Sequence, residues 1–167
     1  MYNTNTYTGS DGSLSISGVD PFDEDLFRDF FGDGGVVGRV TDVTVRVTTE
    51  IKTFHEMGSH APRELRPGNI YIRGTVERAF INGSLLQIML GQYATDEETE
   101  PFKIPSFNMQ LDLDNLRPEG EAGSSRVTLY GVMFDSWDFH VPEADFVLER
   151  LSFQARRISK TDFPVEA

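Results

Sequence analysis

Residues 36–54 read VVGRVTDVTVRVTTEIKTF, and this stretch decides the fold. From residue 42 to residue 53, apolar residues and threonines occupy the odd positions, whereas charged residues and threonines occupy the even positions. Successive side chains of an extended strand point to opposite faces, so this period predicts one strand with an apolar face and a charged face. At ~3.3 Å per residue the strand would be roughly 50 to 60 Å long. So long a strand predicts a sheet that extends beyond one small core, where it can reach a neighbouring subunit.

A second long strand is predicted over residues 70–80, antiparallel to the first, because apolar and polar residues alternate there in the same way. The residues between the two strands, 55–69, are rich in glycine and proline and predict a long inter-strand loop. We expect copies of the chain to associate through the apolar faces of both strands. The residues expected between subunits are Val43, Val45, Val47, Ile51, Ile70, Ile72 and Val76.

The N-terminal part of the chain and a short middle segment predict smaller elements within one domain. Residues 1–18 are polar and predict a flexible arm that leads into a short strand. Residues 20–32 predict an acidic amphipathic helix, which either caps the domain's own core or docks on a neighbouring subunit. Residues 85–90 are apolar nearly all round and predict a short buried helix.

The C-terminal half predicts further strands. Alternating patterns indicate one strand over residues 107–114 and another over residues 126–134. The aromatic residues of 135–142 show no clear period, so this segment is expected to be irregular. A last extended segment is predicted over residues 146–158, although its beginning, PEADFVLER, could instead form a helical turn.

Composition excludes several classes of function. The chain has 167 residues, with 27 acidic against 15 basic residues and a net charge of −12, which argues against a protein that grips nucleic acid through its phosphates. It has no cysteine, no signal-peptide pattern and no apolar run of the length that a membrane helix needs, so we expect a protein assembled in the cytoplasm without a membrane.

Catalytic and metal-binding patterns are also missing from the sequence. The three histidines are poorly spaced for chelation, and neither a nucleophile elbow nor a phosphate-binding loop is present. We therefore expect no enzyme activity, no metal and no cofactor.

Several short motifs carry a resemblance to a known family. The chain resembles the tail tube proteins of tailed phages, those of contractile tails in particular, and the related tubes of type VI secretion and extracellular contractile injection systems. The motifs lie mainly between residues 55 and 91: Glu56-Met57-Gly58-Ser59, Arg66-Pro67-Gly68-Asn69, Gly74-Thr75-Val76-Glu77-Arg78-Ala79-Phe80 and Asn82-Gly83-Ser84-Leu85-Leu86.

This resemblance implies a mainly β fold, an antiparallel β-sandwich or partly open β-barrel with one short flanking helix and an N-terminal arm. Six copies would form a ring with a continuous inner β-barrel, and rings would stack into a hollow conduit for DNA delivery. The implied partners are tail sheath, tape-measure, baseplate and tail terminator proteins, and the implied location is the virion. The alternatives are an inner tube that carries protein effectors and a β-barrel ligand-binding module.

Within a stacked tube, charge suggests contact residues. Seven acids and one base lie in residues 1–35, whereas residues 150–160 hold four bases and no acid, so the two regions could pair between rings. The polar face of residues 107–114 is a candidate lumen wall, where acidic side chains would repel DNA. The candidate residues are Arg63, Glu64, Arg66, Asp23, Asp25, Arg156 and Arg157 for stacking, and Asp112 and Asp114 for the lumen.

Overall fold

Antiparallel strands make up most of the structure, a computed structural model that describes residues 9, 12–18, 28, 35–80, 83–90, 106–115 and 123–163. The predicted fold class is confirmed: a curled antiparallel sheet with one short helix. The strands are β1 (Gly12–Gly18), β2 (Val40–Phe54), β3 (Glu64–Ala79), β4 (Phe107–Asn115), β5 (Gly123–His140), β6 (Leu148–Ala155) and β7 (Arg157–Phe163), and the helix is α2 (Ser84–Leu90).

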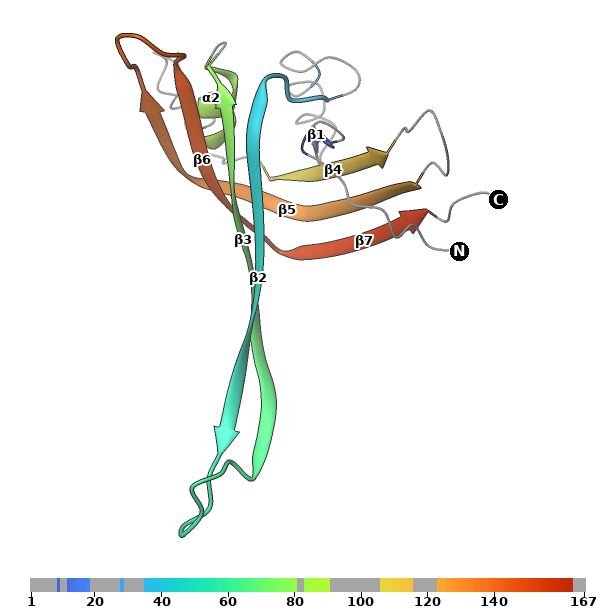
Figure 1. The fold of residues 1–167 in the computed structure, drawn as a ribbon, viewed down its shortest axis with the longest axis vertical. Helices are drawn as coiled ribbons and strands as arrows, with labels where there is room; N and C mark the ends of the chain where they lie inside the picture. Colours follow the sequence, from blue (N-terminus) through green and yellow to red (C-terminus); the bar gives the residue numbers. More distant parts are fainter. Residues whose placement is uncertain are drawn as a thin grey trace, which may run out of the picture.

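The seven strands form one sheet in the order β1-β4-β5-β6-β3-β2, with β7 also paired to β5 (Figure 1). The long strand β5 belongs to both halves of this sheet. Its residues 124–130 lie between β4 and β7, and its residues 133–140 pair with β6. We call β1, β4, the first part of β5 and β7 sheet A, and the second part of β5, β6, β3 and β2 sheet B.

The sheet bends where β5 passes from sheet A to sheet B. Gly131 lies at this bend with a φ of 63°, and a Cβ there would approach Cδ of Arg156 to 2.7 Å. Arg156 separates β6 from β7, and its amide donates to the carbonyl of Tyr130 at 2.9 Å. The hairpin of β5 with β6 and β7 therefore bends as a unit, at a position where only glycine fits without strain.

The curled sheet is joined to itself through the residues that lead into β2. The amide of Ile16 donates to the carbonyl of Gly35, and the amide of Val37 donates to the carbonyl of Leu14, both at 2.8 Å. These bonds attach the outer edge of β1 to the start of β2. The result is a partly open barrel, as the sequence predicted.

The core fills the space between sheets A and B. Helix α2 contributes two fully buried side chains to it, Leu85 and Ile88, which confirms the prediction of a short buried helix. The strands contribute the remaining buried apolar residues: Leu14, Ile16, Val37, Ile72, Val76, Phe107, Met109, Leu129, Val132, Phe134, Leu151 and Phe153.

Three predictions of local structure were wrong. Residues 135–142 are not irregular, because β5 continues to His140. A bulge at Asp135 lies between the pairs Phe134↔Phe153 and Ser136↔Ser152, and this extra residue interrupts the period of two that identifies a strand. The segment 146–158 is two strands broken at Arg156, and its beginning forms no helical turn.

The inter-strand loop is also shorter than predicted, because β3 begins at Glu64 and the connection is residues 55–63. Pro67 and Gly68, which suggested a loop, lie beside a register shift between Thr49 and Ile51. At this point no second described strand pairs with β3, so none needs the missing amide of proline.

Two predicted N-terminal features lie largely outside the described residues. For the arm over residues 1–18, only Gly9 and the short strand β1 are described. For the acidic helix over residues 20–32, only Arg28 is described, and it is helical. Among the described residues, no helix combines the length and the apolar character needed to cross a membrane.

The close approach of β3 to its neighbours at Gly74 can be tested. A Cβ at this position would lie 2.1 Å from the carbonyl oxygen of Thr44 and 2.5 Å from Cζ of Phe153. We expect Gly74→Ala to lower the free energy of unfolding by about 3 kcal/mol, because backbone and a core ring must both move. Urea unfolding measures this, with Gly83→Ala as the control because its Cβ would meet nothing within 4 Å. Equal stability of the two variants would contradict the observed packing of β3 on β2.

Candidate functional site: the β2–β3 ribbon

The far halves of β2 and β3 leave the body of the protein as a two-stranded ribbon. The neighbouring strand β6 ends at Ala155, which pairs with Ile72, so beyond this point β3 has only β2 beside it among the described strands. We call residues 48–71 the ribbon, with residues 55–63 as its tip. Figure 1 shows that the ribbon projects well beyond the other strands.

One face of the ribbon is apolar and continues the core-facing side of sheet B. Cross-strand partners share a face, and the pairs on this face run from Val43↔Val76 through Val47↔Ile72 and Thr49↔Ile70 to Ile51↔Pro67 and Thr53↔Leu65. We call the residues at the far end of this row the apolar ribbon face: Val47, Ile51, Leu65, Pro67 and Ile70.

Exposure changes sharply along this row. Val76 is 1% exposed in the core, whereas Val47 is 49% exposed, and Ile51 and Ile70 are 62% and 64% exposed. A contiguous exposed apolar patch of this kind marks an interaction surface. A two-stranded hairpin is also only marginally stable in water by itself. The ribbon therefore has the properties of a surface that another molecule covers.

The opposite face of the ribbon is polar and stays hydrated. Arg66 pairs with Glu64 at 3.1 Å, and Glu50 accepts a hydrogen bond from the amide of Asn69 at 3.3 Å. Both pairs are exposed, so each contributes at most ~1 kcal/mol to stability. The exposed aromatic side chains Phe54 and Tyr71 also lie on this face, so the two faces of the ribbon strands differ in that only this one carries charged side chains.

The tip of the ribbon has an ordered internal structure. The amide of Arg63 donates to the carbonyl of Phe54 at 2.7 Å, and the side chain of Arg63 pairs with Glu56 at 3.3 Å. The amide and hydroxyl of Ser59 bond to the carbonyls of Glu56 and Ala61. Met57 is fully exposed at this end. The tip therefore presents a defined apolar and charged surface.

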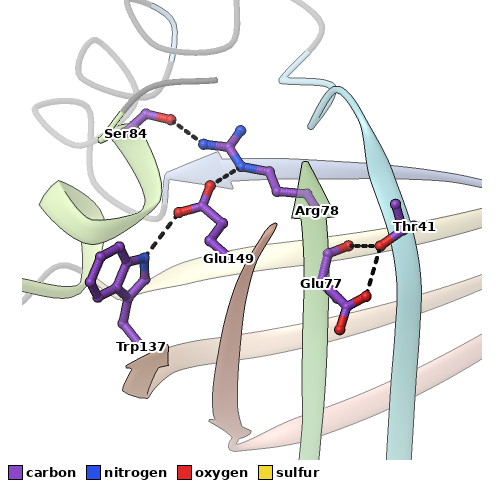
Figure 2. A network of polar contacts seen from close by, with 6 residues as sticks. All are labelled: Thr41, Glu77, Arg78, Ser84, Trp137 and Glu149. Atoms are coloured by element: carbon purple, nitrogen blue, oxygen red, sulfur yellow. Dashed lines mark hydrogen bonds and ion pairs between the residues drawn. The ribbon is translucent and has the colours of Figure 1, made fainter. Parts of the chain in front are cut away.

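A buried polar network lies in the body of the protein, at the end of β3 remote from the ribbon (Figure 2). Arg78 of β3 forms an ion pair with Glu149 of β6 and donates from Nη2 to Oγ of Ser84 in α2 at 3.0 Å. Trp137 of β5 donates from Nε1 to the second oxygen of Glu149 at 2.9 Å. Arg78 and Glu149 are almost completely buried. Three strands and the helix are thus fixed together at the C-terminal end of β3.

The sequence analysis missed this network, although a signal for it exists. Arg78 occupies the core-facing parity of Ile72 and Val76, and Glu149 occupies the parity of Leu151 and Phe153. Two opposite charges that interrupt the apolar rows of adjacent strands indicate a buried ion pair, because a buried charge requires a partner.

Of the residues predicted to lie between subunits, some are buried or half-buried within one copy and others are exposed. Val43 and Val45 are half-buried and Ile72 and Val76 are buried in the subunit's own core, so within one copy only Val47, Ile51 and Ile70 are exposed. The sequence identified the apolar row correctly but could not locate the point where β6 ends and exposure begins.

The residues predicted to stack rings do not form one cluster. Arg63, Glu64 and Arg66 lie at or beside the tip of the ribbon. Arg156 and Arg157 follow Ala155 at the base of the ribbon, where the Arg157 guanidinium lies 4.3 Å from the centre of the Tyr130 ring. Asp23 and Asp25 lie outside the described residues.

The two predicted lumen residues lie on the polar face of sheet A. Asp112 accepts a hydrogen bond from Nε of Arg126 at 2.6 Å, and Asp114 is exposed two residues further along β4. The hydrogen bond that Arg126 donates to Asp112 is the largest cause of the raised pKa of Arg126. In residues 35–80, 106–115 and the other described parts, no group of three His, Asp or Glu side chains is placed to hold a metal ion.

Solved structures with the same fold cover nearly the entire chain. A chain of the sheath-tube complex of PVC, an extracellular contractile injection system, has a TM-score of 0.63 at 11% identity and covers 96% of this chain and 94% of its own length. The SPP1 tail tube has a TM-score of 0.61 at 12% identity, with coverages of 95% and 81%. A chain of the virion of a native gene transfer agent particle has a TM-score of 0.54 at 14% identity, with coverages of 93% and 99%.

No protein-family model matches the chain, and no curated protein sequence matches it. The predicted resemblance to tail tube proteins is confirmed at the level of the fold.

The buried network gives a prediction for stability. We expect Glu149→Gln to lower the free energy of unfolding by about 3 to 5 kcal/mol, because it leaves the guanidinium of Arg78 buried without its counter-charge. Glu64→Gln, which removes the exposed partner of Arg66, should change it by less than ~1 kcal/mol. Urea unfolding of both variants provides the comparison. The double variant Arg78→Met with Glu149→Leu should recover most of the loss, and no recovery would contradict a burial cost.

Proposed function

We propose that this protein is the structural subunit of a tail tube, in which rings of six copies stack head to tail into a hollow conduit for DNA delivery. The observation that carries this proposal is the ribbon, which one copy of the chain leaves uncovered. Its apolar face is the exposed continuation of a core-facing row, and both of its strands have free outer edges among the described residues.

Further copies of the chain are the partner that this surface favours. Free strand edges pair readily with other strands, and a closed ring of subunits removes such edges without aggregation. Sheet B offers one free edge along β2 and another along residues 133–140 of β5, where no described strand pairs on the side away from β6. Sheets of adjacent copies can therefore continue one another, and the number six is implied by the family resemblance.

Stacking of rings is supported by the different surfaces at the two ends of β2. The tip of the ribbon lies beyond Phe54, whereas a groove of about 510 Å³ lies beside the start of the strand. Apolar residues of β1, β4 and the start of β2 line this groove, among them Leu14, Val40 and Leu113. A contact between two unlike surfaces is heterologous and propagates along an axis, as a stacked tube requires.

A tube in a virion would have further partners. The structural neighbours include chains from a sheath-tube complex, a baseplate and a tube-terminating cap. By analogy, we expect this subunit to contact sheath, baseplate and terminator proteins, with a tape-measure protein inside the tube, and to assemble in the host cytoplasm. The second candidate is the inner tube of a contractile injection system that carries protein effectors, which the likeness to the PVC chain supports. No catalytic role is proposed.

Electron microscopy of the purified protein tests the proposal. A tube subunit should form six-fold rings or stacked tubes, and the mass of the ring in native mass spectrometry should equal six chains. A monomer at all concentrations, with the ribbon retained, would contradict the proposal and favour a ligand-binding module.

Variants of the apolar row separate assembly from folding. We expect Ile51→Asp and Ile70→Asp to fold as single subunits but to lose ring and tube formation, because both side chains are exposed in one copy and covered only in the assembly. Val76→Asp should unfold the subunit, because Val76 is buried in its own core. Circular dichroism measures folding, and sedimentation velocity measures assembly. Thr53→Ser, a conservative change on the same face, is the control, and normal tubes from Ile51→Asp would show that the apolar ribbon face is not a contact.

A further inference from the structure

The net charge of the chain lies entirely outside its described scaffold. The described residues contain 13 acidic and 13 basic residues, and therefore carry no net charge. The remaining residues contain 14 acids against Lys103 and Arg117, which accounts for the net charge of −12. The charge of the sheets must therefore be judged from their own residues and not from the composition of the chain.

The polar face of sheet B carries both signs of charge in nearly equal number. The registers of β2, β3, β5 and β6 place six acids and five bases on this face. The acids are Asp42, Glu50, Glu64, Glu77, Asp135 and Asp138, and the bases are Arg46, Lys52, Arg66, Arg73 and Arg150.

Between β2 and β3 like charges on this face lie opposite each other, with Asp42 opposite Glu77 and Arg46 opposite Arg73. Arg150 of β6 pairs in register with Glu77 of β3 on one side and with Asp138 of β5 on the other. Side chains in directly opposite positions are within reach of one another, so the single cation lies between two carboxylates. With Asp42 opposite Glu77 this row is acidic overall, and the next charged row toward the ribbon is basic, with Arg46 opposite Arg73, so the two signs balance along the strands.

Hydrogen bonds compensate the acid at the bulge of β5. Asp135 accepts from the hydroxyl of Ser152 and from Nε2 of Gln154, the latter at 3.0 Å. The hydroxyl of Ser152 also contacts that of Ser136. The hydrogen bond from Ser152, with a smaller contribution from the nearby Arg73, holds the pKa of Asp135 below its usual value. The carboxylate is therefore ionised at neutral pH and already engaged by groups of its own sheet.

Strand edges distinguish sheet B from sheet A as the wall of a conduit. A continuous inner barrel needs a sheet whose two outer edges can both pair with neighbouring copies. Sheet B has two such edges, along β2 and along residues 133–140 of β5. In sheet A the outer edge of β1 already bonds to Gly35 and Val37 of the same chain. Judged from the described strands, sheet B is therefore the one that can be extended at both sides.

We propose that the polar face of sheet B lines the lumen of the assembled tube as a charge-compensated wall that neither repels nor binds a polyanion. This inference rests on the proposed tube function and deepens it. The wall faces water, and its six acids and five bases nearly cancel. Charged cargo then meets little net field from the wall.

The inference differs from the sequence-based expectation of an acidic lumen at Asp112 and Asp114. Those two acids lie on the polar face of sheet A, which also carries Arg126 and Arg157 and is likewise balanced. An experiment that identifies the luminal face therefore decides between the two sheets.

Cysteine labelling identifies the luminal face directly, because the natural chain has no cysteine and each variant carries a single thiol. Thr44→Cys places the thiol on the polar face of sheet B, where Thr44 is exposed, and Thr161→Cys places it on the polar face of sheet A. Assembled tubes are treated with a small maleimide dye and with a maleimide coupled to a large globular protein. Thr75→Cys, on the same face of sheet B, is a second position in case Thr44→Cys fails to assemble.

We expect the Thr44→Cys thiol to react in tubes with the small dye but not with the large reagent, and the Thr161→Cys thiol to react with both. The reverse pattern would overturn the inference and favour the lumen at Asp112 and Asp114. If the cysteine-free parent forms no tubes, the proposed function itself fails, which is a distinguishable result.

The charge of the wall is measured at the same thiol. An anionic and a cationic methanethiosulfonate are reacted with Thr44→Cys at low ionic strength, where screening is weak. We expect the ratio of the two rates in tubes to stay within roughly threefold of the ratio in dissociated subunits, whereas an acidic lumen would slow the anionic reagent by roughly tenfold or more. A tenfold change would overturn the compensated wall.

Two variants, one in each sheet, test whether the charges of sheet B determine the ratio of the two reaction rates. Arg150→Gln removes the cation between Glu77 and Asp138, so it should slow the anionic reagent at the Thr44→Cys thiol relative to the cationic one. Arg126→Gln removes a cation from sheet A and should leave the ratio unchanged. Equal effects of the two substitutions would contradict a wall formed by sheet B.

Discussion

The antiparallel pairing of β2 with β3 is the interaction on which the rest of the structure depends. It runs from Val40↔Arg78 to Phe54↔Glu64, but β6 and the core lie beside only its first half. Backbone hydrogen bonds hold both halves extended in the same way, whereas the apolar side chains are buried or half-buried in one half and exposed in the other. A single structural element is thus both the centre of the subunit's fold and its uncovered contact surface.

The buried ion pair of Arg78 and Glu149 fixes the register of β3 against β6. Transfer of both charges from water is unfavourable, and the hydrogen bonds from Trp137 and to Ser84 offset part of that cost. A shift of β3 by one residue would move Arg78 to the polar face and turn the apolar row of the ribbon away from its side of the sheet. The pair therefore fixes which face of the projecting ribbon is apolar.

The sequence predicted elements well where side chains alternate without interruption, as in β2, β3 and β4. It failed at Asp135, at the Gly131–Arg156 bend and at Pro67, because bulges and bends depend on partner strands that no local pattern reveals. The apolar contact residues were predicted as one group, but their division into buried and exposed depends on the length of β6. The burial of Arg78 could be predicted only together with its partner Glu149 on another strand.

Net charge illustrates why composition gives only a coarse guide to a surface. The total of −12 suggested acidic strand faces, yet the described scaffold is neutral because it contains as many bases as acids. This distribution has a consequence for assembly. Copies of a scaffold without net charge can approach edge to edge with little electrostatic repulsion, whereas the same −12 spread over the strands would oppose close packing of subunits. A neutral scaffold therefore allows association through apolar and backbone contacts, while the chain as a whole keeps the charge that favours solubility.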